Sequence, residues 1–250
     1  MTAPAPARVP AGGGDAMMDV ETIRPGLWRW TAPHPDWTEK DGGPGGWARD
    51  VASFYYEAPG HVVLLDPQVP PDGAPDAERF WRALDRDVQR LQLPVAVLLT
   101  QGWHERSASA VYERYHTRPG ASVWVPRASR NEVEGTATDT FVPGDPLPGG
   151  VQAFGPRGPE TGEVLYYLPQ HAALMSGDHL VAEGDGRLRL GWIDDEVWKQ
   201  ERLLPTLRAL LDLPLEMVLV AHGRSILSGG KEALAQAIQE PAWGDLTLKP

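Results

Sequence analysis

A chain of 250 residues, of which 42% are hydrophobic, is long enough to bury one substantial core. Its 34 acidic and 23 basic residues are scattered and give a formal net charge of −11, which argues against a nucleic-acid or anionic-membrane surface. Because cysteine is absent, the sequence excludes a disulfide framework, a thiolate nucleophile and a cysteine-ligated zinc site.

The N-terminal segment "MTAPAPARVPAGGGDA" consists mainly of Ala, Pro and Gly. We expect residues 1–17 to form a disordered tail before a single domain over residues 18–250. Met1 and Met17 or Met18 are alternative translation starts. No apolar run approaches the ~20 residues of a membrane span, and the N-terminus lacks a secretory-signal pattern. These features predict a cytoplasmic protein with no membrane partner.

The first half of the chain alternates predicted strands and helices. Apolar runs cut by Gly and Pro predict strands in "VETIRPGLWRWTA" and two more in "SFYYEAPGHVVLLDP", joined by a turn at Pro59 and Gly60. "PVAVLLT" has the continuous apolar character of a strand buried on both faces. A helix over "ERSASAVYERY" and a strand over "ASVWVP" complete a β-α-β-α-β run.

The first helix of that run is predicted over "DAERFWRALDRDVQRL". Its apolar residues fall three or four positions apart, as one face of a helix requires, and Asp76 is placed to cap its start. The apolar residues are Phe80, Leu84, Val88 and Leu91.

The second half repeats the theme with more strands. We expect strands in "VQAFGP", "GEVLYYLP", "AALMSGDHLV" and "EMVLVAHG", and a terminal helix in "GGKEALAQAIQ". A further helix in "ERLLPTLRALLDL" is predicted to start only at Pro205, since Pro suits a first turn and not a helix interior. Two similar halves predict an α/β fold of two packed sheets with helices outside.

Four segments together resemble the landmarks of the metallo-β-lactamase-fold superfamily, from about Val20 to Ile238. They are "VVLLDPQVP", "VAVLLTQGWHERSAS", "GEVLYYLPQHAALMSGDHLV" and "MVLVAHGRSIL". The resemblance implies a four-layered αββα sandwich, with the site at one edge of the two sheets on loops that follow strands.

The family's metal motif is only partly present. Members carry an Asp after a strand, then T-H-x-H-x-D-H, G-H-T-x-G, G-D and a strand ending in S-H-G. The resemblance places Asp66, Asp178 and His222 at three of these landmarks. Aligned on Thr100, the remaining family ligands are replaced. Gln101 and Trp103 stand for the first two histidines, Glu105 for the aspartate, Arg106 for the last histidine and Pro159 for the next.

These replacements predict that the family's first metal position is empty. At the second, Glu105, Asp178 and His222 survive in kind, whereas the guanidinium of Arg106 cannot coordinate a metal. We expect Arg106 to pair with Asp178 or Glu105 and to take over the neutralising role of the metal, so no cofactor is expected. The alternative is one zinc or another divalent transition metal held by Glu105, Asp178 and His222.

The other cleft residues have open roles. His104 is either a general base or replacement ligand oriented by Glu105, or a satisfied loop histidine. Trp103 is expected to fill the vacated ligand volume with an apolar ring. Asp66 is expected to tie its turn to backbone N–H groups. His116 and His179 have no family counterpart and are expected to be surface or packing residues.

Four N-terminal tryptophans are expected either to line the same cleft or to pack in the core. They are Trp28, Trp30, Trp37 and Trp47. The loop "HPDWTEKDGGPGGW" is a candidate lid over the cleft.

Two functions follow. The first is a pseudo-enzyme or small-ligand-binding member of the superfamily. Its cleft would be lined by Gln101, Trp103, Arg106, Asp66, Asp178 and His222. The second is an active hydrolase of esters, lactones or thioesters that uses a single metal. A purely structural subunit is a third. The sequence indicates a small-molecule partner and no nucleic acid, and leaves the oligomeric state open.

Overall fold

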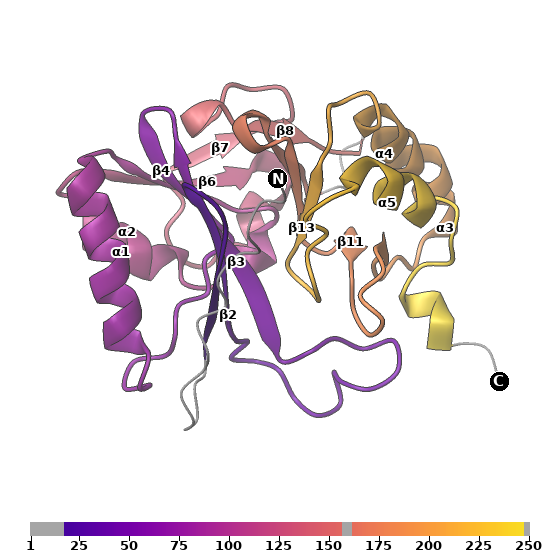
Figure 1. The fold of residues 1–250 in the computed structure, drawn as a ribbon, viewed down its shortest axis with the longest axis horizontal. Helices are drawn as coiled ribbons and strands as arrows, with labels where there is room; N and C mark the ends of the chain where they lie inside the picture. Colours follow the sequence, from indigo (N-terminus) through magenta and orange to yellow (C-terminus); the bar gives the residue numbers. More distant parts are fainter. Residues whose placement is uncertain (1–17, 157–161, 248–250) are drawn as a thin grey trace, which may run out of the picture.

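Two β-sheets face each other and carry helices on their outer faces (Figure 1), so the predicted four-layered αββα sandwich is confirmed. The computed structural model describes residues 18–156 and 162–247. The predictions made for residues 1–17 and for Pro159 lie outside the described residues. Within them, no helix combines the length and apolar character needed to cross a bilayer.

The first sheet has seven strands in the order β1-β2-β3-β4-β5-β6-β7. Pairing is antiparallel from β1 to β4 and parallel from β4 to β7. The strands are β1 Asp19–Arg24, β2 Leu27–Pro33, β3 Asp50–Ala58, β4 His61–Leu65, β5 Val95–Leu98, β6 Ala121–Pro126 and β7 Asp139–Phe141.

Helices α1 (Ala77–Leu91) and α2 (Ala108–Tyr115) connect the parallel strands and cover the outer face of this sheet (Figure 1). The predicted apolar face of α1 is correct, because Phe80, Leu84 and Val88 are buried against the outer face of the first sheet. Asp76 is the N-cap residue, as predicted, but its side chain does not cap the helix. Asp76 has helical backbone angles and makes no capping hydrogen bond, and its carboxylate pairs instead with Arg79 at 3.1 Å.

The second sheet has four strands in the order β13-β10-β9-β8, and a two-stranded sheet pairs β11 with β12. The strands are β8 Gln152–Phe154, β9 Leu165–Leu168, β10 Ala173–Ser176, β11 Leu180–Val181, β12 Arg189–Leu190 and β13 Met217–Val220. The run "AALMSGDHLV" therefore splits into β10 and β11, because the chain turns at Gly177 and Asp178. Short 3₁₀ helices span Gly102–Glu105, Arg127–Glu132, Pro148–Gly150, Pro169–His171 and Gly244–Thr247.

The α-helix that contains Pro205 begins at Leu204, so the proline lies in its first turn as predicted, but other helical segments precede it. Segment α3 (Glu196–Trp198) runs into a π-helical segment, Lys199–Leu203, and then into α4 (Leu204–Leu210). Proline has no N–H to donate to the preceding turn, and a wider turn before it accommodates the missing bond. With α5 (Gly230–Ala237), these helices pack on the outer face of the second sheet through leucines such as Leu207 and Leu234.

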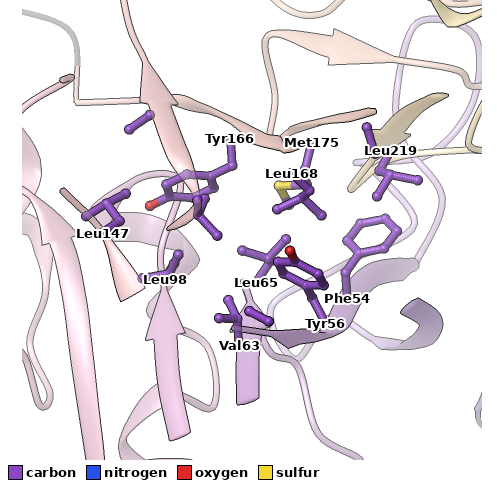
Figure 2. Packing of buried hydrophobic residues seen from close by; sticks show 14 of the residues in the cluster. Phe54, Tyr56, Val63, Leu65, Leu98, Leu147, Tyr166, Leu168, Met175 and Leu219 are labelled. Atoms are coloured by element: carbon purple, nitrogen blue, oxygen red, sulfur yellow. The ribbon is translucent and has the colours of Figure 1, made fainter. Parts of the chain in front are cut away.

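The inner faces of the two sheets meet in an apolar core (Figure 2). Phe54 and Leu65 of the first sheet face Met175 and Leu219 of the second, and all four are fully buried. Burial of a side chain of this size stabilises the fold by about 1.5–3 kcal/mol. This core holds the two sheets together and fixes the relative position of the loops at their common edge.

Candidate functional site

The predicted site residues come together at one edge of the sandwich, on segments that follow strands. Asp66 follows β4, His104 follows β5, Asp178 follows β10 and His222 follows β13. Strands β4 and β5 run parallel, as do β10 and β13, so each pair delivers its loops to one edge. A hydrogen bond of 2.8 Å from the N–H of Ala52 to the carbonyl of Ala221 joins the two sheets there.

His104 is positioned by a buried carboxylate. It lies in the 3₁₀ helix Gly102–Glu105, and its Nδ1 is 2.8 Å from Oδ2 of Asp66. Asp66 also accepts hydrogen bonds from the backbone N–H of Thr100 at 2.8 Å and from its hydroxyl at 2.6 Å. Asp66 thus ties the turn to a backbone N–H, as predicted, and in addition orients an imidazole. With Nδ1 held by Asp66, Nε2 of His104 faces the rest of the site.

Two imidazoles converge on one carboxylate. Nε2 of His104 and Nε2 of His222 lie 3.4 Å and 3.1 Å from Oδ1 of Asp178. The side-chain amide of Gln101 donates to Oδ2 of Asp178 at 2.6 Å. One potential ligand atom from each of His104, Asp178 and His222 lies within 4.8 Å of the other two. We call these three residues the triad.

The ionisable groups of the triad shift each other's pKa. Although burial and the Arg106 charge lower it, the carboxylates of Asp178 and Asp66 raise the pKa of His104 to about 9. Against the opposing effect of burial, the imidazoles of His104 and His222 hold the pKa of Asp178 well below its usual range. Without a metal, the triad therefore carries an imidazolium beside an ionised carboxylate at neutral pH.

The donor set of the triad fits a transition metal. Two imidazoles and one carboxylate are three donors of the kinds that catalytic zinc sites use, with a further position left for water or substrate. The carboxylate behind His104 is the usual partner of a metal-bound histidine. Nδ1 of His222 is buried and has no hydrogen-bond partner among the described residues, so its Nε2 is not fixed in the same way.

Glu105 does not belong to this donor set, contrary to the prediction from the resemblance. Its Oε2 accepts a hydrogen bond from the backbone N–H of Gly135 at 3.0 Å. The 3₁₀ helix turns residue 104 toward Asp178 and residue 105 toward the segment at Gly135. His104 therefore takes the place in the cluster that the alignment gave to Glu105.

The predicted ion pair of Arg106 is also wrong. Within residues 18–156 and 162–247, the guanidinium makes no ion pair with Asp178 or Glu105. Its Nη1 donates to the carbonyls of Ala52 at 3.2 Å and Asp66 at 3.1 Å. These carbonyls lie near the start of β3 and just after the end of β4, and that of Asp66 also accepts a hydrogen bond from the Ser53 hydroxyl at 2.7 Å. Arg106 has a positive φ of 39°. Its charge still acts on the site, since it lowers the pKa of His104.

Trp103 does not fill the vacated ligand volume, because its side chain is turned outward and the residue is 73% exposed. Other tryptophans contact the triad. The rings of Trp47 and Trp192 meet His222 edge-on, at centroid distances of 5.1 Å and 5.3 Å. Trp37 supports this arrangement by donating to the carbonyl of Trp47 at 3.0 Å.

The other two N-terminal tryptophans lie elsewhere. Trp28 stacks on Tyr55 and Trp30 packs against Phe80, both on the outer side of the first sheet under α1. Half of the predicted tryptophan set therefore belongs to the core, where burial of aromatic area is its main contribution.

A cleft of about 460 Å³ adjoins the triad through Gln101 and Asp178. Its wall includes two residues that the sequence did not point to as functional, Glu163 and His179. His179 is buried, so it is not a surface residue, whereas His116 is exposed and stacks on Tyr112. A volume of this size suits a small-molecule ligand.

Glu163 and His179 form a buried pair behind Asp178. Oε1 of Glu163 accepts the backbone N–H groups of Asp178 at 2.8 Å and His179 at 2.9 Å, and its Oε2 lies 3.1 Å from Nδ1 of His179. Burial, with the Asp178 charge, raises the pKa of Glu163 to about 8, and burial lowers the pKa of His179 to about 4. The only sequence signal was that His179 follows Gly177 and Asp178.

The arrangement of the two sheets and the helices that cover them is similar to that of solved metallo-beta-lactamase structures. The chain aligns with the metallo-beta-lactamase FIM-1 from Pseudomonas aeruginosa in its mono-zinc form at a TM-score of 0.60 and 15% identity, over 90% of this chain and 96% of that one. A metallo-beta-lactamase from Pontibacter korlensis aligns at a TM-score of 0.57 and 18% identity, over 90% and 100%.

A metallo-beta-lactamase family protein from Thermus thermophilus aligns at a TM-score of 0.55 and 17% identity, over 87% and 80% of the two chains. No protein-family model matches the sequence, and no curated protein matches it. The chain therefore has the metallo-β-lactamase fold, as the resemblance implied, and the low identities leave its activity to be argued from its own site.

Proposed function

We propose that the protein is a hydrolase of ester-like substrates that uses a single divalent transition metal held by His104, Asp178 and His222. The observation that carries this proposal is the convergence of the three donor groups with the Asp66 carboxylate behind His104. The triad replaces the set Glu105, Asp178 and His222 that the sequence suggested. The mono-zinc form of FIM-1 is a precedent for one metal in a protein of this fold.

A divalent ion held by the triad would supply Lewis acidity toward a substrate carbonyl. The surrounding side chains have separate roles. Gln101 donates to Oδ2 of Asp178 and orients that carboxylate, while Asp66 orients His104. Glu163 accepts the N–H of Asp178 and fixes the backbone from which this carboxylate projects. The adjoining cleft would place a substrate against Gln101 and Asp178.

A second candidate is a metal-free, ligand-binding member of the superfamily. It is favoured by the direct contacts of Asp178 with both imidazoles, which neutralise the carboxylate without an ion. The cytoplasmic location expected from the sequence belongs to either candidate and stays a prediction.

Metal analysis and titration separate the two candidates. Protein purified without chelators is analysed for bound transition metal, and metal-free protein is titrated with zinc by calorimetry and by thermal shift. We expect one zinc per chain, a higher melting temperature with zinc, and zinc-dependent hydrolysis of 4-nitrophenyl acetate. Absence of binding and of activity would overturn the metal proposal and support the ligand-binding candidate.

Matched variants locate the metal. His104→Gln should weaken zinc binding at least about tenfold, as loss of a ligand or of its support does. The matched variant Glu105→Gln introduces the same residue at the next position, whose side chain contacts Gly135, and it should bind zinc like the wild type. The reverse order would return Glu105 to the ligand set and remove His104.

A further inference from the structure

The cleft beside the triad is lined by aromatic and acidic side chains. Three tryptophans and five acidic residues contribute to it, and none of its described lining residues is lysine or arginine. The tryptophans are Trp103, Trp192 and Trp198. The acidic residues are Glu132, Glu163, Asp178, Asp194 and Asp195.

The charges and aromatic rings of this lining favour cationic over anionic ligands. Glu132, Asp194 and Asp195 are exposed at the mouth of the cleft, and they repel anionic ligands. The faces of indole rings attract cations, by about 0.5–1 kcal/mol at exposed sites and about 2 kcal/mol where water is excluded. The net charge of −11 reinforces the local field. Glu132, Asp194 and Asp195 are not donors of the triad, so a divalent ion bound there would leave their negative charges free to act on a ligand.

A separate observation points to a ligand in the same cleft. His179 is a lining residue that is only 8% exposed, and its Nε2 is buried with no hydrogen-bond partner among the described residues. Its Nδ1 is already engaged by Glu163. A buried polar nitrogen without a partner is costly, so a polar group of a bound ligand would remove a penalty that the free protein carries.

We infer that this cleft binds small organic cations of the alkylammonium type, and that the substrates of the proposed hydrolase are esters with an ammonium group. The second part rests on the proposed function. In the reaction, one water is consumed: the acyl carbon–oxygen bond breaks, the hydroxyl joins the acyl carbon, and the released alcohol takes the proton. The ammonium group would lie between the tryptophans and the carboxylates at the mouth, with the ester directed toward the triad.

Binding is tested first, on the full-length metal-free protein, so that the result does not depend on catalysis. Choline and its uncharged isostere 3,3-dimethyl-1-butanol are titrated by tryptophan fluorescence and calorimetry. We expect choline to bind at least about tenfold more tightly, with an affinity that falls as salt is added. Equal binding of the two compounds, or no binding of choline, would overturn the cation site.

Surface variants test the contacts without threatening the fold. Trp103→Ala should weaken choline binding about two- to fivefold, as expected for an exposed indole, whereas Trp103→Phe, which keeps an aromatic face, should retain most of it. Asp194→Asn should weaken choline binding and leave binding of the neutral isostere unchanged. Asp72→Asn, a change of equal charge at an exposed position outside the cleft, is the control and should have no effect.

Hydrolysis is tested next on zinc-loaded protein with acetylcholine and 3,3-dimethylbutyl acetate. The inference predicts a higher kcat/KM for acetylcholine, carried mainly by KM. Hydrolysis of both esters at equal rates would overturn the cation preference and support the hydrolase. Choline binding without hydrolysis of either ester would support the cation site and overturn the hydrolase, so the two failures are distinguishable.

Discussion

Oδ2 of Asp66 and Nδ1 of His104 lie 2.8 Å apart, and both side chains are buried. The contact joins the loop after β4 to the 3₁₀ helix after β5, and Thr100 adds two hydrogen bonds to the same carboxylate. One aspartate therefore sets the conformation of the turn and the orientation of the imidazole. This dual role makes Asp66 the first residue to test.

Asp66→Ala should lower the free energy of unfolding by about 2–4 kcal/mol, because it leaves the N–H and hydroxyl of Thr100 and the Nδ1 of His104 without a buried acceptor. Urea denaturation of the metal-free protein measures the change. Asp72→Ala, at an exposed position, is the control and should change stability by less than about 0.5 kcal/mol. A similar small loss for Asp66→Ala would contradict the role assigned to this carboxylate.

The stability of the metal-free protein should depend on pH through His104. Its pKa is about 9 in the folded protein and about 6.5 when unfolded, so the stabilisation is complete below pH 6.5. It is lost as pH rises through 9, by about 3 kcal/mol at most. Unfolding curves between these pH values, compared with those of His104→Gln, isolate the effect. Parallel curves for the two proteins would show that His104 is not protonated in this way.

Glu163 should give the stability a second pH dependence. As with His104, the stability should fall with rising pH, but over a lower pH range. Its pKa, raised by burial to about 8 from 4.5, means that the folded protein keeps a proton that the unfolded chain releases. The free energy of unfolding should therefore fall as pH rises from 4.5 through 8. Glu163→Gln retains an oxygen for the N–H groups of Asp178 and His179 and removes the titration, so its stability should fall less across this range. An unchanged slope in the variant would contradict the shifted pKa.

Gly223 tests the backbone beside His222. It has φ of +87°, and a Cβ there would lie 2.1 Å from the carbonyl oxygen of Ala182. Gly223→Ala should cost about 2–4 kcal/mol in stability, from backbone strain and steric conflict together, and should weaken zinc binding by displacing His222. Gly60→Ala is the matched control, because Gly60 also has positive φ, at +75°, and a Cβ there would meet no atom within 4 Å. Equal losses in the two variants would show that the close approach to Ala182 has no consequence.

Periodicity predicted the elements of the fold well, since strands buried on both faces and amphipathic helices leave continuous or repeating apolar patterns. The apolar faces of α1 and β5 are examples. The errors lie where local chemistry competes. The side chain of Asp76 pairs with Arg79 and does not cap the helix, and the helical segments before Pro205, one of them π-helical, were not predicted.

The site was predictable by location and only partly by residue. Asp66, Asp178 and His222 follow strands whose ends share an edge; Asp178 and His222 meet there, and Asp66 is linked to them through His104. Which side of a single 3₁₀ turn faces the site depends on angles that the motif does not encode. His104 therefore joins the triad, one of the roles left open for it, while Glu105 contacts Gly135 and Asp66 orients the imidazole. Arg106 donates to two backbone carbonyls brought together by the ends of neighbouring strands, a juxtaposition that a sequence does not reveal.

The triad draws His104 from the loop after β5 in one sheet and Asp178 and His222 from the loops of the other. Any ion or ligand that engages all three therefore acts as a cross-link between the two halves of the sandwich. Its binding energy opposes their separation directly, so saturation of the site should slow amide hydrogen exchange in β5 and β13 together and make the halves open as one cooperative unit.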